Sequence, residues 1–149
     1  MSVSHIARSA LEDFRERHGL SLHWEKDAVY EVTTDFGFCV RLFAEEESGL
    51  IRAWTALCPE APEEARASVH AALLEANLAD SLVFGGSLAL EPETLAIVYQ
   101  RAYDPRQGGA SGFSRFFLAF AETASGLQGA VAALVADEAD APVFSGAHI

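Results

Sequence analysis

The chain has 149 residues, the length of one ordinary domain, and half of them are apolar, so it can bury one sizeable core. Ten basic against 22 acidic residues give a net charge of −12 at pH 7. Binding to nucleic acid or to an anionic membrane needs clustered Lys and Arg, so neither is expected as a partner. Because no apolar run of about 18 residues and no signal-peptide pattern occurs, we expect a cytoplasmic protein without membrane insertion.

The first half of the chain predicts one helix and three strands. Apolar residues at helical spacing predict a helix over residues 2–18 that ends at Gly19. Alternating residues then predict strands at residues 27–33, 36–43 and 50–58. A polar turn that ends in Gly49 joins the last two of these strands as a hairpin. On the second strand, one face carries Phe36, Phe38, Val40 and Leu42.

The second half predicts a helix, two strands and a final helix. Pro62 and the two glutamates after it predict a helix that runs to about Leu78. Its apolar residues form two stripes, so it is either deeply buried or packs on the sheet and also on another copy of itself. Two apolar strands follow, at residues 82–90 and 95–103. The Gly-rich residues 104–112 predict a flexible loop, and regularly spaced apolar residues from Phe113 onward predict a helix.

These elements predict an α+β fold of two layers, in the order α-β-β-β-α-β-β-α. Short hairpins connect the strands, so the sheet is antiparallel and twisted, with helices packed against it. Residues 1–136 form a single domain, and residues 137–149 form a flexible tail without apolar period. Cys39 and Cys58 are too few for a disulfide framework and are interpreted as buried, reduced thiols.

No combination of residues indicates catalysis, so we expect no enzyme, no metal and no cofactor. The five histidines lack ligand spacing, and no serine lies in a nucleophile elbow. Gly85-Gly86 lacks the third glycine of a nucleotide loop and is more typical of a bulge or of close packing. What remains is apolar surface, which is either all core or partly an open strand edge or groove for an extended peptide.

Two motifs carry a resemblance to a known family. The helix end Leu73-Leu74-Glu75-Ala76-Asn77-Leu78 precedes a hairpin that contains Gly86-Ser87-Leu88-Ala89-Leu90 and Leu95-Ala96-Ile97-Val98-Tyr99. A helix with spaced Phe residues, from Phe113 to Phe120, then follows. In this order, over residues 2 to about 135, the chain resembles the type III secretion chaperones of the Tir-chaperone or CesT-like family.

The resemblance implies a cytoplasmic homodimer that is not an enzyme. It implies binding of the N-terminal segment of a secreted effector in extended form, which keeps the effector soluble and ready for delivery to the secretion ATPase. The dimer interface would be formed by the second helix, through Val69, Leu73, Leu74 and Asn77. Grooves for the effector would use apolar positions of the first helix and first strands: Ile6, Phe14, Tyr30, Val32, Phe36 and Phe38.

Two other functions stay open at this point. A regulatory binding module similar to the YbjN group would also be a small acidic α+β protein. A small enzyme would need a carboxylate such as Glu31 or Asp35 in an apolar pocket that raises its pKa.

Overall fold

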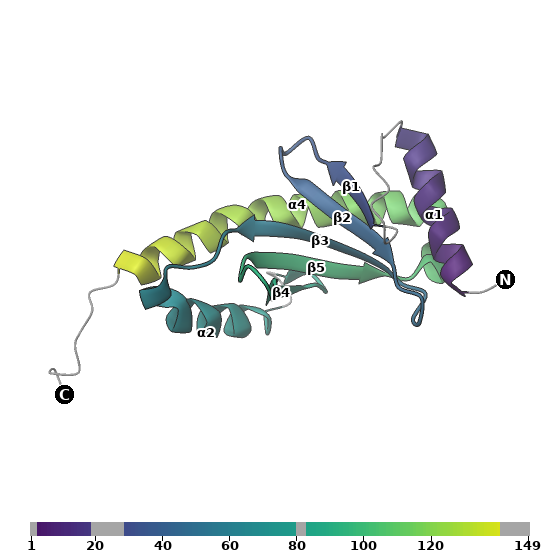
Figure 1. The fold of residues 1–149 in the computed structure, drawn as a ribbon. Helices are drawn as coiled ribbons and strands as arrows, with labels where there is room; N and C mark the ends of the chain where they lie inside the picture. The colour runs from purple at the N-terminus through teal and green to yellow at the C-terminus, as the bar shows by residue number, and fades with distance from the viewer. Residues whose placement is uncertain (1–2, 19–28, 80–82, 141–149) are drawn as a thin grey trace, which may run out of the picture.

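The computed structural model describes residues 3–18, 29–79 and 83–140 and shows a five-stranded antiparallel sheet with helices packed against it (Figure 1). The strand order across the sheet is β1-β2-β3-β5-β4, so β1 and β4 are its two edges. The predicted α+β class is confirmed. In chain order the elements are α1 (Val3–His18), β1 (Val29–Thr33), β2 (Cys39–Ala44), β3 (Ile51–Cys58), the 3-10 turn η1 (Glu63–Ala65), α2 (Arg66–Ala76), β4 (Ser87–Leu90), β5 (Ile97–Tyr103) and α4 (Pro105–Asp140).

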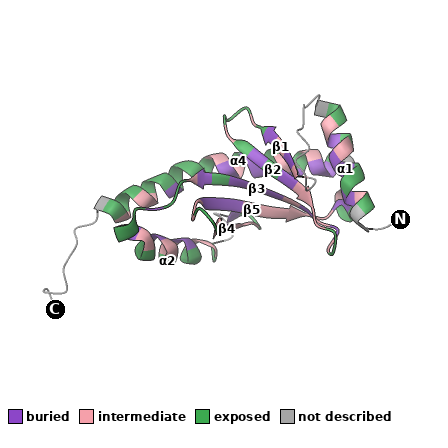
Figure 2. Ribbon diagram, in the orientation of Figure 1, coloured by how far each residue is buried: buried purple, intermediate pink, exposed green. Residues whose placement is uncertain are grey.

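The sheet has one buried face and one open face. Along its strands, buried residues are interspersed with more exposed ones (Figure 2). Burial alternates along β1, β2 and β3, as a two-residue period requires. The buried face packs on α1 and α4, and its residues on these three strands are Tyr30, Val32, Val40, Leu42, Ile51, Ala53, Thr55 and Leu57. The opposite face, which we call the open face, carries polar and charged side chains such as Glu31, Arg41 and Arg52.

The long helix α4 crosses behind the sheet (Figure 1). Its buried stripe confirms the period predicted from Phe113 onward and consists of Phe113, Phe116, Phe120, Ala124, Leu127 and Val131. Tyr99 of β5 stacks on Phe120, with 5.1 Å between ring centroids. Among the described helices, the segment Ser111–Ala139 alone is long and apolar enough to cross a membrane by length and composition.

The predicted flexible loop at residues 104–112 is wrong, because α4 already begins at Pro105. The Asp104 carboxylate accepts the backbone N–H of Arg106 at 3.0 Å and caps the first turn. A Cβ at Gly108 or Gly112 would overlap Tyr103 Oη, so these glycines make room for a packed tyrosine. The helix also includes residues 137–140 of the predicted tail, and the rest of that tail lies outside the described residues.

Two strands, β2 and β4, begin three or more residues later than predicted. Residues 34–37 form a turn closed by a 3.0 Å bond from the Gly37 N–H to the Thr34 carbonyl, so β2 begins at Cys39. Phe84 and Gly85 have φ of 47° and 80°, in the left-handed region, so the extended part of the next strand begins only at Ser87. The predicted burial of the cysteines is also wrong, since Cys39 is exposed and Cys58 is only half-buried; both are free thiols.

Candidate functional site

An apolar groove lies where α1, the end of β1 and α4 meet. It encloses about 550 Å³. We call it the α1–α4 groove; its apolar lining is Phe14, Val32, Phe36, Phe117, Leu118 and Ala121. The other lining residues are polar: Thr33, Thr34, Asp35, Ser114 and Arg115.

Aromatic packing fixes the inner wall of this groove. Phe14 is buried, meets Phe113 edge-to-face at 4.9 Å and lies 5.0 Å from Phe117, so it locks α1 onto α4. Two large apolar side chains of the groove are open to solvent. Phe36, in the turn after β1, is 50% exposed, and Leu118 on α4 is 57% exposed. Neighbouring exposed apolar side chains in a concave site favour a contact surface for a ligand.

The edge strand β1 runs beside the groove, since Val32 and Thr33 are among its lining residues. The Thr34 N–H donates to the Phe38 carbonyl at 2.9 Å. This bond shows which facing residues of β1 and β2 form hydrogen-bonded pairs. Because bonded pairs alternate along antiparallel strands, the backbone groups of Glu31 and Thr33 point away from β2. Within the described residues no hydrogen bond satisfies these outward groups. An extended peptide can therefore pair with β1 and place side chains in the groove.

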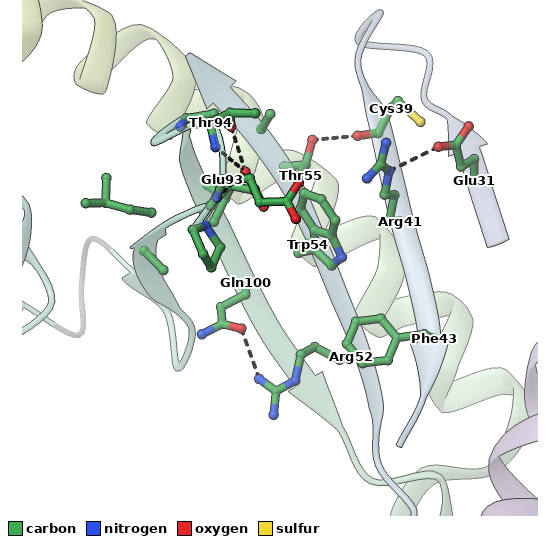
Figure 3. Close-up of a pocket in the computed structure, with 17 residues that line it drawn as sticks. Glu31, Cys39, Arg41, Phe43, Arg52, Trp54, Thr55, Glu93, Thr94 and Gln100 are labelled. Carbon is green, nitrogen blue, oxygen red and sulfur yellow. Dashed lines mark hydrogen bonds and ion pairs between the residues drawn. The ribbon is translucent and has the colours of Figure 1, made fainter. Parts of the chain in front are cut away.

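The open face of the sheet holds a second, wider hollow of about 830 Å³ (Figure 3). The two arginines that line it are each paired with a glutamate. Arg41 Nε donates to Glu31 at 3.0 Å, and its guanidinium lies 4.8 Å from the centre of the Trp54 ring. Arg52 donates to Glu45 at 2.7 Å. Since both arginines of the hollow already have glutamate partners and, within the described residues, no exposed large apolar side chain lines it, the α1–α4 groove is the stronger candidate for a peptide site.

The structure brings three of the six predicted effector-binding residues into the groove: Phe14, Val32 and Phe36. The other three do not line it. Tyr30 is a core residue whose hydroxyl donates to Glu12 Oε1 at 2.9 Å, which ties α1 to β1. Burial, together with the Glu12 carboxylate, raises the pKa of Tyr30 above its ordinary value. Ile6 and Phe38 are half-buried outside the groove.

Sequence reasoning missed the contribution of α4 to the groove, through Phe117 and Leu118. The regularly spaced phenylalanines predicted a helix but did not separate core from groove, and Phe113, Phe116 and Phe120 are core residues. Leu118 lies outside the buried stripe of α4, and a large apolar residue off the stripe is the signal that could have identified it.

Two of the four predicted dimer-interface residues are core residues of the protomer. Val69 and Leu73 are 0% and 3% exposed, so they pack inside the protomer and their assignment to a surface seam is corrected. Asn77 bonds to the backbone of Leu88 in β4. Leu74 is 70% exposed and Leu78 is 88% exposed. The second apolar stripe of this region therefore stays open, and we call Leu74 and Leu78 the α2 patch.

The described residues contain no group of three His, Cys, Asp or Glu side chains that could hold a metal ion. Neither carboxylate of the enzyme hypothesis is buried, although Asp35 lines the α1–α4 groove. Glu31 is paired with Arg41, and Asp35 is exposed in the turn after β1.

The model of the Tir chaperone protein (CesT) family matches residues 9–128. The chain belongs to this family. Membership confirms the predicted resemblance, and with it the expectation that the protein is a chaperone and not an enzyme. A comparison with curated protein sequences found no significant match.

Solved structures share the fold of this CesT-family chain at low sequence identity. A chain of the HopA1–SchA chaperone–effector complex has a TM-score of 0.65 at 15% identity, over 84% of this chain and 94% of that chain. The Yersinia pestis type III secretion chaperone SycH, in complex with a stable fragment of YscM2, has a TM-score of 0.56 at 17% identity, over 79% and 96%. E. coli YbjN has a TM-score of 0.58 at 16% identity, over 80% and 87%.

Proposed function

We propose that this protein is a type III secretion chaperone that binds the N-terminal segment of a secreted effector in extended form. The bound client stays soluble and competent for secretion in the cytoplasm until the complex is delivered to the secretion ATPase. The observation that carries the proposal is the α1–α4 groove, with exposed Phe36 and Leu118. It lies beside the edge strand β1, which pairs on one side only within the described residues. Family membership and the chaperone–effector complex among similar structures support it.

The free energy gained by binding exceeds the cost of ordering an extended segment only if the contact is long. Apolar burial contributes about 25 cal/mol per Å². Ordering an extended segment costs free energy for each residue that is fixed, so one short groove is not enough. The β1 edge adds backbone hydrogen bonds to the burial, and a homodimer would offer two such surfaces. The net charge of −12 keeps chaperone and complex soluble.

The proposal is tested by co-expression with secreted proteins encoded near this gene, followed by gel filtration. One such protein should co-elute with the chaperone. The matched control is the same client without its N-terminal segment, which should elute alone. A chaperone that co-elutes with no secreted protein, or binds the truncated client equally well, would contradict the proposal.

For the assembly, we propose a homodimer that buries the α2 patch. The double variant Leu74→Asp, Leu78→Asp should be monomeric, because the dimer interface would have to desolvate two unpaired carboxylates from each protomer, at several kcal/mol. Both side chains are exposed in the protomer, so the fold should be kept. Sedimentation equilibrium and circular dichroism measure the two outcomes. The control Phe84→Asp, which is also at an exposed position, should remain dimeric; a wild-type protein that is monomeric at micromolar concentration would rule the homodimer out.

A regulatory binding module is the second candidate function, and the similarity to E. coli YbjN in fold is the observation that favours it. Such a module would use the same groove for a different peptide. A gene neighbourhood without secretion or effector genes would favour this candidate over the chaperone.

A further inference from the structure

One edge of the sheet is closed by a side chain. Asn77 follows α2 and lies beside the edge strand β4. Its Nδ2 donates to the Leu88 carbonyl at 2.9 Å, and its Oδ1 accepts the Leu88 N–H at 2.6 Å. An asparagine amide carries a donor and an acceptor, like a peptide group. Asn77 therefore takes the place that one residue of a pairing strand would occupy.

The alternation of hydrogen-bonded pairs between β4 and β5 shows that the backbone N–H and C=O of Leu88 point away from β5. The Glu91 N–H donates to the Ala96 carbonyl at 2.9 Å, at the turn end of the hairpin. Since bonded pairs alternate, Leu88 and Leu90 point their backbone groups away from β5. The next outward position before them is Gly86, whose N–H donates to the Val83 carbonyl at 2.9 Å. The β4 edge is thus closed at Leu88 and partly closed at Gly86.

The opposite edge of the sheet, β1, differs from β4 in the hydrogen bonding of its outward backbone groups. On β1, the outward backbone groups of Glu31 and Thr33 have no hydrogen-bond partner within the described residues. An open strand edge can pair with any extended segment, including the edge of another copy. A protein that handles extended chains therefore gains specificity if one of its two edges is blocked.

We propose that Asn77 blocks the β4 edge against extended segments and so restricts strand pairing to the β1 edge. The client part of this inference rests on the proposed chaperone function. The self-pairing part does not, because it concerns copies of this chain alone. A side chain suits the task, since it satisfies Leu88 without adding a strand that would present a new edge.

Two substitutions at Asn77 expose the β4 edge to different extents. Asn77→Ala removes both hydrogen bonds to Leu88, whereas Asn77→Asp keeps an acceptor for the N–H and leaves the carbonyl without a donor. Losing one such bond corresponds to about tenfold in an opening equilibrium. In Asn77→Ala the Leu88 amide should therefore exchange hydrogen at least about tenfold faster, and species larger than wild type should appear in sedimentation velocity. The exposed neighbour Glu75→Ala should behave as wild type.

A second-site change separates edge pairing from simple loss of stability. The Leu90 N–H points away from β5, so Leu90→Pro removes an edge donor without removing a bond of the β4–β5 ladder. Combined with Asn77→Ala, it should abolish the larger species while the Leu88 amide still exchanges fast.

The outcome that overturns the proposal is an Asn77→Ala protein with wild-type size, whether or not its stability has fallen. Should that variant not fold, Asn77→Asp carries the test, and its failure to form larger species overturns the proposal in the same way. All of these measurements use the chaperone without client. A failure to find an effector would therefore leave the result on Asn77 intact.

Discussion

Leu118→Asp is expected to lower the affinity for a client segment by about a hundredfold while the protein stays folded. Leu118 is 57% exposed in the free chaperone, so an aspartate there remains hydrated. In the complex the carboxylate would lose water inside an apolar groove, and the apolar contact of leucine would be missing, together roughly 2–3 kcal/mol. A difference of about 1.4 kcal/mol is tenfold in the dissociation constant. Isothermal titration calorimetry with the co-purified client segment measures the change, and Phe36→Asp should act in the same direction.

The matched control is Phe84→Asp, at a position that is 56% exposed and does not line the groove. Its client affinity should equal that of the wild type. Thermal unfolding of each variant checks that the fold is kept. Wild-type affinity in Leu118→Asp would exclude the α1–α4 groove as the client site and direct attention to the hollow on the open face.

Patterns that depend on local geometry were predictable from the sequence. The side-chain alternation of a strand is a property of its backbone, so the period of two placed Val40 and Leu42 on one face, and both are buried. The same holds for the stripe of α4 that begins at Phe113. The family resemblance rested on the order of such elements, and the match of the family model confirms it.

The elements that sequence reasoning missed are those in which tertiary packing overrides local preference. Gly108 and Gly112 favour a loop by propensity, yet they lie in α4, where the absence of a Cβ lets the Tyr103 hydroxyl approach closely. Phe84 was predicted in a strand because it lies in the apolar run of residues 82–90. Its left-handed backbone conformation depends on the turn that brings β4 to the sheet, which no local pattern contains.

The candidate site was only half predictable for a related reason. Core and groove residues share one apolar pattern, and the difference between them is which neighbour covers them. Phe36 and Val40 follow the same alternation, but the turn at residues 34–37 takes Phe36 out of the strand and leaves it half exposed. The two stripes of α2 were visible in the sequence. That the Val69 stripe is covered and the Leu74 side is open depends on the docking of α2 beside β4.

Gly86→Ala is expected to destabilise the protein by about 3 kcal/mol, at the upper end of the usual effect of overpacking. A Cβ at this position would overlap the Gln100 backbone oxygen and would lie 2.6 Å from the Tyr99 ring. Neither neighbour can easily move. Gln100 belongs to the central part of β5, and Tyr99 is fully buried, with its hydroxyl bonded to the Val83 carbonyl at 2.6 Å. Urea unfolding followed by circular dichroism measures the loss.

The control for this prediction is the same chemical change at Gly126 or Gly129, where a Cβ would meet nothing within 4 Å. Both lie on exposed positions of α4, so alanine should stabilise the protein by up to about 1 kcal/mol through helix propensity alone. Opposite signs for Gly86→Ala and Gly126→Ala would show that the motif glycine is required by the close approach of β4 to β5. A Gly86→Ala protein as stable as the wild type would mean that β4 can shift away from β5, although Asn77 holds its outer edge.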